Sequence, residues 1–192
     1  MKLYLFDFDG TLYNGDSMFD FLKYVHKNIF KYWLLNAFFI PFFLLKLLRL
    51  INTTQAKTLF LKIHLFLYKS DYIVNCSMQF SIKVKEKLFK KAKDYLNTIS
   101  GEKCIVSASV DIWMKDISKE LGVNLICTES IFKDGKFSKI LTNCNEDEKL
   151  NRIKSFYNLK DFESINAYGN SKGDMAMYSL GKKHHKIFIG NE

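Results

Sequence analysis

The chain has 192 residues, of which 48% are hydrophobic, and its formal net charge is +9. One proline and nine glycines argue against a fibrous or disordered protein, and the length suits one α/β domain with a modest insertion. The four cysteines are widely spaced and form no C-x-x-C pair, and the first ten residues become acidic too soon for a secretory signal. We therefore expect a reduced, cytoplasmic chain.

Short apolar runs that alternate with helical patterns predict an α/β fold with a parallel, doubly wound sheet. The predicted strands are KLYLFDF from Lys2, KCIVSAS from Lys103, NLICTES from Asn124, SINAYG from Ser164 and KIFIG from Lys186. Helices are predicted over residues 111–121, about 146–157 and about 173–180. The segment IFKDGKFS predicts a β-hairpin that turns at Asp134 and Gly135.

Residues 17–98, here called the helical insertion, contain no glycine, and their apolar residues recur at helical spacing. We predict a core of residues 1–16 and 99–192 and an all-helical cap domain of residues 17–98. The insertion carries 14 Lys and Arg against 4 Asp and Glu. This excess favours an anionic substrate, a membrane surface or nucleic acid, although solvated helix faces explain it equally. No nucleic-acid fold signature accompanies it, so we expect no nucleic-acid partner.

The stretch YWLLNAFFIPFFLL, residues 32–45, has no charge and is flanked by basic residues at both ends. As one helix it would span about 21 Å, which is less than the ~30 Å hydrocarbon core of a bilayer. Pro41 would also kink or interrupt it. Two interpretations stay open: a buried helical pair, and a shallow segment whose basic flanks meet anionic headgroups.

Two acidic residues, Asp7 and Asp9, follow the first predicted strand in FDFDGT. Open α/β sheets bind ligands at the carboxyl ends of their strands. Two carboxylates at that position can divide the work between a nucleophile and a proton carrier. Gly10 allows a sharp turn, and Thr11 can hydrogen-bond back into the loop.

The segment DFDGTLYNGD resembles the first motif of the haloacid dehalogenase-like (HAD) phosphatases. The other motifs follow in order: Ser107 in IVSAS, Lys149 in NEDEKLNRI, and the acidic motif in GNSKGD. The resemblance covers essentially the whole chain. It implies a Rossmann-like core with a C1-type helical cap after the first strand, as in phosphoserine phosphatase-like members.

The resemblance implies a Mg²⁺-dependent phosphomonoester hydrolase with an aspartyl-phosphate intermediate. Asp7 would attack phosphorus, and Asp9 would protonate the leaving oxygen and then activate water. The phosphate-binding residues would be Thr11, Ser107 and Lys149. The Mg²⁺ ligands would come from Asp7, Asp9, Asn170 and Asp174. Ser107 as a small strand-end residue and Lys149 as a solvated lysine are the structural alternatives.

The fourth motif departs from the acidic pattern because its first candidate ligand, Asn170, is an amide. An amide supplies one less negative charge, which predicts weaker metal binding and leaves open whether Asn170 or Asp174 contacts the ion. It also leaves open a HAD-fold module that binds a phosphorylated ligand with little turnover. Asp16 occupies the position of the family's substrate-recognition Glu, and an N-cap of the next helix is its alternative role.

A narrower resemblance concerns DFDGTLYNGDSMFDFLKYV followed by FFIPFFLLKLL. These segments look like bacterial phosphatidylglycerophosphate phosphatases of the C type, HAD enzymes with a membrane-associated cap. That resemblance implies a phospholipid phosphate as substrate and an anionic membrane surface, at the cytoplasmic face of the inner membrane, as partner. The alternative is a small soluble phosphorylated substrate. The sequence does not set the oligomeric state.

Overall fold

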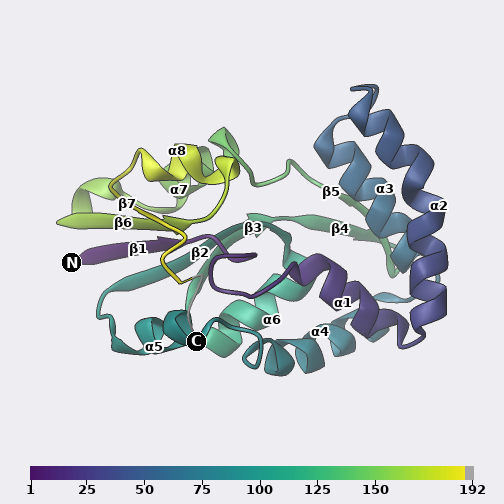
Figure 1. The fold of residues 1–192 in the computed structure, drawn as a ribbon, viewed down its shortest axis with the longest axis horizontal. Coiled ribbons are helices and arrows are strands. Elements are labelled where there is room, and N and C mark those ends of the chain that lie inside the picture. The colour runs from purple at the N-terminus through teal and green to yellow at the C-terminus, as the bar shows by residue number, and fades with distance from the viewer. Residues whose placement is uncertain (189–192) are drawn as a thin grey trace.

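A computed structural model describes residues 1–188 of the chain (Figure 1). Strands β1 (Lys2–Phe6), β2 (Glu102–Val110), β3 (Asn124–Thr128), β6 (Ser164–Gly169) and β7 (Lys182–His185) pair in parallel in the order β3-β2-β1-β6-β7. The chain moves outwards from β1 through β2 to β3, and then from β6 to β7 on the other side. The carboxyl ends of β1 and β6 therefore form a topological switch point, where such sheets bind ligands.

Helices cover both faces of the sheet. α7 (Asp147–Phe156) and α8 (Met175–Tyr178) lie on one face, and α5 (Lys90–Thr98) and α6 (Asp111–Leu121) lie on the other (Figure 1). Side chains along β1 alternate between the two cores: Leu3 and Leu5 pack into one, and Tyr4 and Phe6 into the other. Short 3₁₀ turns at Leu159–Asp161 and Lys172–Asp174 precede β6 and α8. The predicted α/β fold with a parallel sheet is confirmed.

The helical insertion consists of α1 (Ser17–His26), α2 (Ile29–Leu47), α3 (Thr53–Leu65), α4 (Ser70–Val84) and α5, which follow one another between β1 and β2. This confirms an all-helical insertion after the first strand. One apolar cluster runs from the insertion into the core, and within it the ring of Phe21 stacks on Trp113 at 5.2 Å between centroids. A separate cap domain with boundaries at residues 17 and 98 stays a prediction.

The predicted hairpin is also present. β4 (Ser130–Lys133) and β5 (Lys136–Ile140) pair antiparallel, and α3 packs against β5. Asp134 and Gly135 have φ angles of 50° and 69°. Positive φ at both central residues is the geometry that an Asp-Gly turn supplies.

The last predicted strand, KIFIG, is wrong for the part of it that the structure describes. β7 ends at His185, and Lys186 leaves the strand with a φ of 55°; Ile189 and Gly190 lie outside the described residues. β7 is an edge strand of polar residues, so it carries no apolar alternation. The ring of His184 stacks on Tyr168 of β6 at 4.3 Å between centroids, a contact that the sequence pattern does not reveal.

The apolar stretch around Pro41 is a single helix, and the interpretation as a buried helical pair is wrong. α2 continues through Pro41, and within this fully described helix Tyr32 is its one buried residue. Large apolar side chains such as Phe30, Leu34 and Phe38 are more than half exposed. α2 is long and apolar enough to cross a membrane, judged by length and composition alone.

Candidate active site

The site begins where β1 ends. The backbone N–H of Asp7 donates to the carbonyl of Tyr168 at 2.8 Å, which continues the pairing of β1 with β6. The chain then turns tightly, because the N–H groups of Thr11, Leu12 and Tyr13 all donate to the carbonyl of Phe8. Asp7 and Asp9 thus project from a rigid turn at the switch point of the sheet.

A buried lysine joins two carboxylates. Lys149, in the first turns of α7, donates to Oδ1 of Asp7 at 2.8 Å and to Oδ1 of Asp174 at 2.7 Å. Lys149 is 2% exposed and Asp174 is fully buried. Burial alone would lower the pKa of Lys149, but the two carboxylates raise it overall. Burial raises the pKa of Asp7, with Lys149 acting in the opposite direction. Lys149 as a solvated helix lysine is therefore excluded.

Asp9 is held differently, by groups of the helical insertion and β2. Its Oδ1 accepts from the backbone N–H of Ser17 at 2.6 Å, and its Oδ2 accepts from Oγ of Ser109 at 2.5 Å. Burial, followed by the nearby charge of Asp16, raises the pKa of Asp9 to about 6. Asp7 and Asp9 therefore sit in different environments although they are two residues apart: a lysine donates to Asp7, whereas a serine hydroxyl and a backbone N–H donate to Asp9.

The loop after β6 brings its two acidic-motif residues to different places. Asn170 lines the pocket, and its Nδ2 donates to the backbone carbonyl of Asp9 at 3.2 Å. Asp174 lies behind it: its Oδ2 accepts from the N–H groups of Asn170 and Ser171 and from Oγ of Ser171. Gly10 has a φ of 70°, and a Cβ there would collide with the side chain of Asn170. The turn after β1 thus requires glycine for the loop after β6 to approach.

These groups line a cavity of about 250 Å³. Of the residues predicted from sequence, the cavity brings together Asp7, Asp9, Asp16, Ser107, Lys149 and Asn170. Two others stand outside its lining. Thr11 donates from Oγ1 to Oδ2 of Asp7 at 3.2 Å, and Asp174 is covered by Lys149 and Ser171. Asp16 caps α1, because its carboxylate accepts from the N–H of Met18, and it also lines the cavity; substrate recognition by Asp16 stays a prediction.

Several cavity residues were not predicted. Ser109 holds Asp9 and lines the cavity, and it stands two residues after Ser107, so strand periodicity could have found it. Ser107 itself accepts from the N–H of Ser109 at 3.0 Å. Lys57 reaches in from α3 and Asn145 from the segment before α7. Lys57 has no motif around it, whereas Asn145 opens the segment NEDEKLNRI that carries Lys149, so its place in that motif could have identified it.

The oxygen donors in the cavity fit a magnesium ion. Among residues 1–188, no group of three or more His, Cys, Asp and Glu side chains could hold a metal ion. Mg²⁺, however, accepts carbonyl and amide oxygens and retains waters. Asp7, Asp9 and Asn170 all line the cavity, and the Nδ2 of Asn170 donates to the backbone carbonyl of Asp9, so the atom of this amide that could bind a metal is Oδ1. This donor set fits Mg²⁺ with one charge fewer than an acidic pair would supply.

Comparison with known proteins agrees with this geometry. A family model described as haloacid dehalogenase-like hydrolase matches residues 4–179. A search of curated proteins gives no match. A protein of unknown function from Bordetella pertussis Tohama I superimposes with a TM-score of 0.79 at 20% identity, over 94% of this chain and 87% of the other.

Two further solved structures carry functional names. A phosphoserine phosphohydrolase-like protein from Francisella tularensis subsp. tularensis SCHU S4 has a TM-score of 0.64 at 19% identity, over 94% of this chain and 83% of that one. A substrate-bound phosphoserine phosphatase has a TM-score of 0.65 at 17% identity, over 96% and 85%. At these identities the likeness shows the fold, and it lends no support to the narrower resemblance to phosphatidylglycerophosphate phosphatases. Because the family model spans most of the chain, the protein belongs to the haloacid dehalogenase-like hydrolases.

Proposed function

We propose that the protein is a Mg²⁺-dependent phosphomonoester hydrolase that works through an aspartyl-phosphate on Asp7. The observation that carries the proposal is the convergence of Asp7, Asp9, Ser107 and Lys149 on one cavity at the switch point of the sheet. Phosphoryl transfer needs an in-line nucleophile, charge neutralisation around phosphorus and a proton for the leaving oxygen. This cavity offers a residue for each need.

In the first step, the carboxylate of Asp7 attacks phosphorus and the bond from phosphorus to the ester oxygen breaks. Asp9 gives its proton to that oxygen, which leaves as an alcohol. Lys149 offsets the negative charge on the phosphoryl group, and the Ser107 hydroxyl donates a hydrogen bond to one of its oxygens. Lys149 is held 2.8 Å from Oδ1 of Asp7 before the substrate arrives, so little reorganisation is needed.

In the second step, Asp9 takes a proton from water and the water oxygen attacks phosphorus. The bond between Asp7 and phosphorus breaks, and inorganic phosphate leaves. The side chain of Asp9 is suited to act twice because the N–H of Ser17 and the Oγ of Ser109 fix its position. Asp7 returns to its starting state as a carboxylate.

Asp7, the backbone carbonyl of Asp9 and Asn170 would hold Mg²⁺, which when bound supplies positive charge to the phosphoryl oxygens. We assign Asp174 a positioning role. Asp174 is fully buried and does not line the cavity, and its oxygens accept from Lys149 on one side and from Ser171 and the N–H of Asn170 on the other. Asp174 would thus orient the lysine and the loop.

The proposal is tested by hydrolysis of an aryl phosphate with and without Mg²⁺. Asp7→Asn should lower kcat by on the order of 10³-fold or more, because an amide cannot form the phospho-enzyme. The exposed Asp147→Asn is the matched control and should retain activity. Wild-type turnover in Asp7→Asn would refute the mechanism. Absence of turnover in the native protein, with phosphate still bound, would favour a binding module instead.

A second candidate is the same chemistry on a phospholipid phosphate at a membrane. The exposed apolar surface of α2 favours it, since an apolar helix with basic residues at both ends suits an anionic bilayer surface. Flotation with anionic vesicles at low salt tests the idea. The protein should float with anionic vesicles and stay below neutral ones, and a protein that stays in the aqueous fraction with both would remove the reason to prefer a lipid.

A further inference from the structure

An apolar groove of about 360 Å³ lies between α1, α2 and α3, beside the candidate active site. Its lining consists of Met18, Phe19, Asn36, Phe39, Ile40, Phe43, Lys46, Thr53, Ala56, Lys57 and Phe60. Rings form its wall: Phe60 meets Phe39 at 4.8 Å and Phe19 at 5.6 Å between centroids. None of these apolar residues has a role in the proposed chemistry.

The groove and the catalytic cavity are neighbours that share two lining residues, Met18 and Lys57. Lys57 marks the boundary. Its Nζ donates to the carbonyl of Ala108 at 2.6 Å and to Oδ1 of Asn143 at 3.2 Å, so its charge lies on the catalytic side. A molecule that occupies both spaces would therefore have a polar end in the catalytic cavity and an apolar end in the groove.

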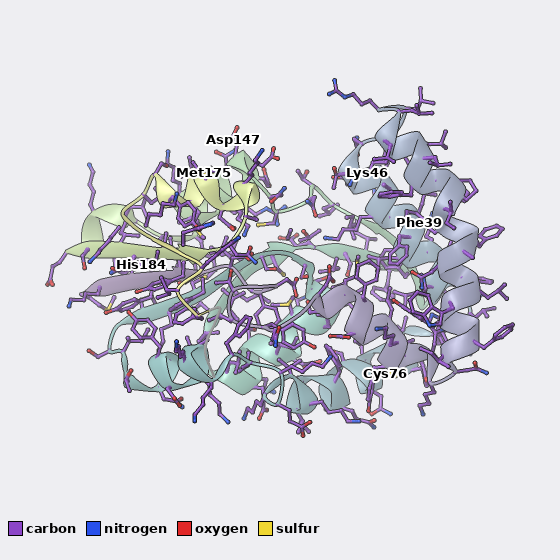
Figure 2. All side chains as sticks on the ribbon, in the orientation of Figure 1. Phe39, Lys46, Cys76, Asp147, Met175 and His184 are labelled. Carbon is purple, nitrogen blue, oxygen red and sulfur yellow. The ribbon has the colours of Figure 1, made fainter. Side chains whose placement is uncertain are left out.

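The groove follows one face of α2. Asn36, Phe39, Ile40 and Phe43 are spaced at i, i+3, i+4 and i+7, and the stretch from Asn36 to Lys46 covers about 15 Å of helix. Figure 2 shows Phe39 on the side of α2 that is turned towards the rest of the molecule. Ile40 and Phe43 nevertheless remain 56% and 46% exposed. Apolar surface of this extent is typical of an interaction site, and its place beside the catalytic cavity favours a ligand-binding groove.

We propose that this groove binds the hydrocarbon chain of a phosphate monoester whose phosphoryl group occupies the catalytic cavity. The inference rests on the proposed function and names its substrate class. A peptide in the groove would need a partner for each backbone polar group, and most of the wall consists of rings and aliphatic side chains, with Asn36, Lys46, Thr53 and Lys57 as its polar members. A hydrocarbon chain needs no such partners and gains from leaving water.

The test is a series of straight-chain alkyl phosphates, from ethyl to decyl, assayed as dispersed monomers with Mg²⁺. Each methylene that enters the groove should raise kcat/KM about twofold to fourfold. The rise should stop once the groove is filled. A series of alkylphosphonates, which cannot be hydrolysed, should show the same trend in binding measured by calorimetry.

Two matched variants locate the effect. Ile40→Glu places a charge in the groove at a position that is 56% exposed, and Leu34→Glu places one on α2 outside the groove at a position that is 59% exposed. Both should fold, since both sites face solvent. Ile40→Glu should flatten the chain-length dependence and leave ethyl phosphate unaffected, and Leu34→Glu should keep the full dependence.

The outcomes separate this inference from the proposed function. Hydrolysis of all chain lengths at one rate would refute hydrocarbon binding in the groove, and the proposed phosphatase activity would still hold. Equal flattening by Leu34→Glu would also overturn it, because the effect would then belong to the whole helix. If no ester is hydrolysed, the proposed function fails, and phosphonate binding then tests the groove by itself. Tighter binding of decylphosphonate than of methylphosphonate, lost in Ile40→Glu, would support a hydrocarbon site in the groove. Equal binding of the two phosphonates would refute it.

Discussion

The catalytic cluster and helix α2 depart from the usual distribution of residues in opposite ways. Asp7, Lys149 and Asp174 are charged and buried, and each is paired. α2 is almost entirely apolar and yet exposed over most of its length. Charged residues are rarely buried without partners, and exposed apolar patches on soluble domains are generally small. Both regions therefore hold features that stability alone does not explain.

The comparison also separates two kinds of structural cause. In the cluster, each buried charge is stable because the neighbouring charge compensates for its desolvation. Removal of any one member should therefore lower the free energy of unfolding strongly. In α2, most of the apolar side chains are left uncovered, so replacing one on the outer face, such as Leu34, should hardly affect folding. The following predictions test that contrast.

The largest effect is expected from Lys149→Met. This change leaves two buried carboxylates without their cation, which costs about 3–5 kcal/mol in the free energy of unfolding. Denaturant titration measures the loss, and phosphatase activity should fall with it. Lys154→Met, at an exposed position in the same helix, is the control and should be near neutral. Equal stability of the two variants would show that the buried cluster does not behave as a coupled unit.

A smaller effect is expected from the buried histidine pair that joins α1 to α3. Nε2 of His26 lies 2.8 Å from Nδ1 of His64, and Nδ1 of His26 contacts the hydroxyl of Tyr68. Burial, with the charge of Lys31, lowers the pKa of His26 to about 4; burial, with His26, lowers that of His64 to about 3. In the unfolded chain both histidines titrate near 6.5.

The unfolded chain therefore binds more protons than the native protein between pH 6.5 and about 4, so stability should fall as the pH falls through that window. Thermal unfolding across the range measures the slope. His64→Gln should reduce the slope, because one titrating group is removed. A slope that His64→Gln leaves intact would place its origin elsewhere.

Asn170→Asp should tighten Mg²⁺ binding by on the order of tenfold, because a carboxylate adds charge to the donor set. Calorimetric titration with Mg²⁺ measures this without reference to activity. Asp174→Asn should weaken binding through the loop and Lys149. Unchanged affinity in Asn170→Asp would mean that Asn170 does not contact the ion.

The smallest effect is expected from Leu34→Glu on the outer face of α2. The side chain is 59% exposed, so the free energy of unfolding should change by no more than about 0.5 kcal/mol. By contrast, Leu61→Ala in the adjacent α3 removes a fully buried side chain and should cost about 2–5 kcal/mol. A large loss in Leu34→Glu would show that the outer face of α2 packs against something in solution.

Sequence reasoning performed unequally on these two regions. It predicted one site containing Asp7, Asp9, Ser107, Lys149 and Asn170, all of which line the cavity. This was possible because strand ends and the order of the motifs can be recognised from short segments of sequence. It did not resolve α2, because an apolar run reads the same whether tertiary packing covers it or leaves it exposed. Lys57 escaped detection for a similar reason: its place at the cavity depends on how α3 docks, which no local pattern encodes.

The polar edge strand β7 was misplaced because its pairing with β6 does not need apolar alternation. The positioning of Asp174 behind Lys149 was likewise not readable from spacing. The carboxylate follows Asn170 by four residues, and only the folded loop turns it away from the cavity.

The central claim is that Asp7 becomes phosphorylated during turnover. Rapid mixing with an aryl phosphate and Mg²⁺, followed by acid quenching and mass spectrometry of the tryptic peptide that spans residues 3–23, tests it directly. We predict that one phosphoryl group appears on Asp7 in the native protein, within the first turnover, and is absent in Asp7→Asn. Steady hydrolysis without a phosphorylated peptide, or with the group on another residue, would contradict the account.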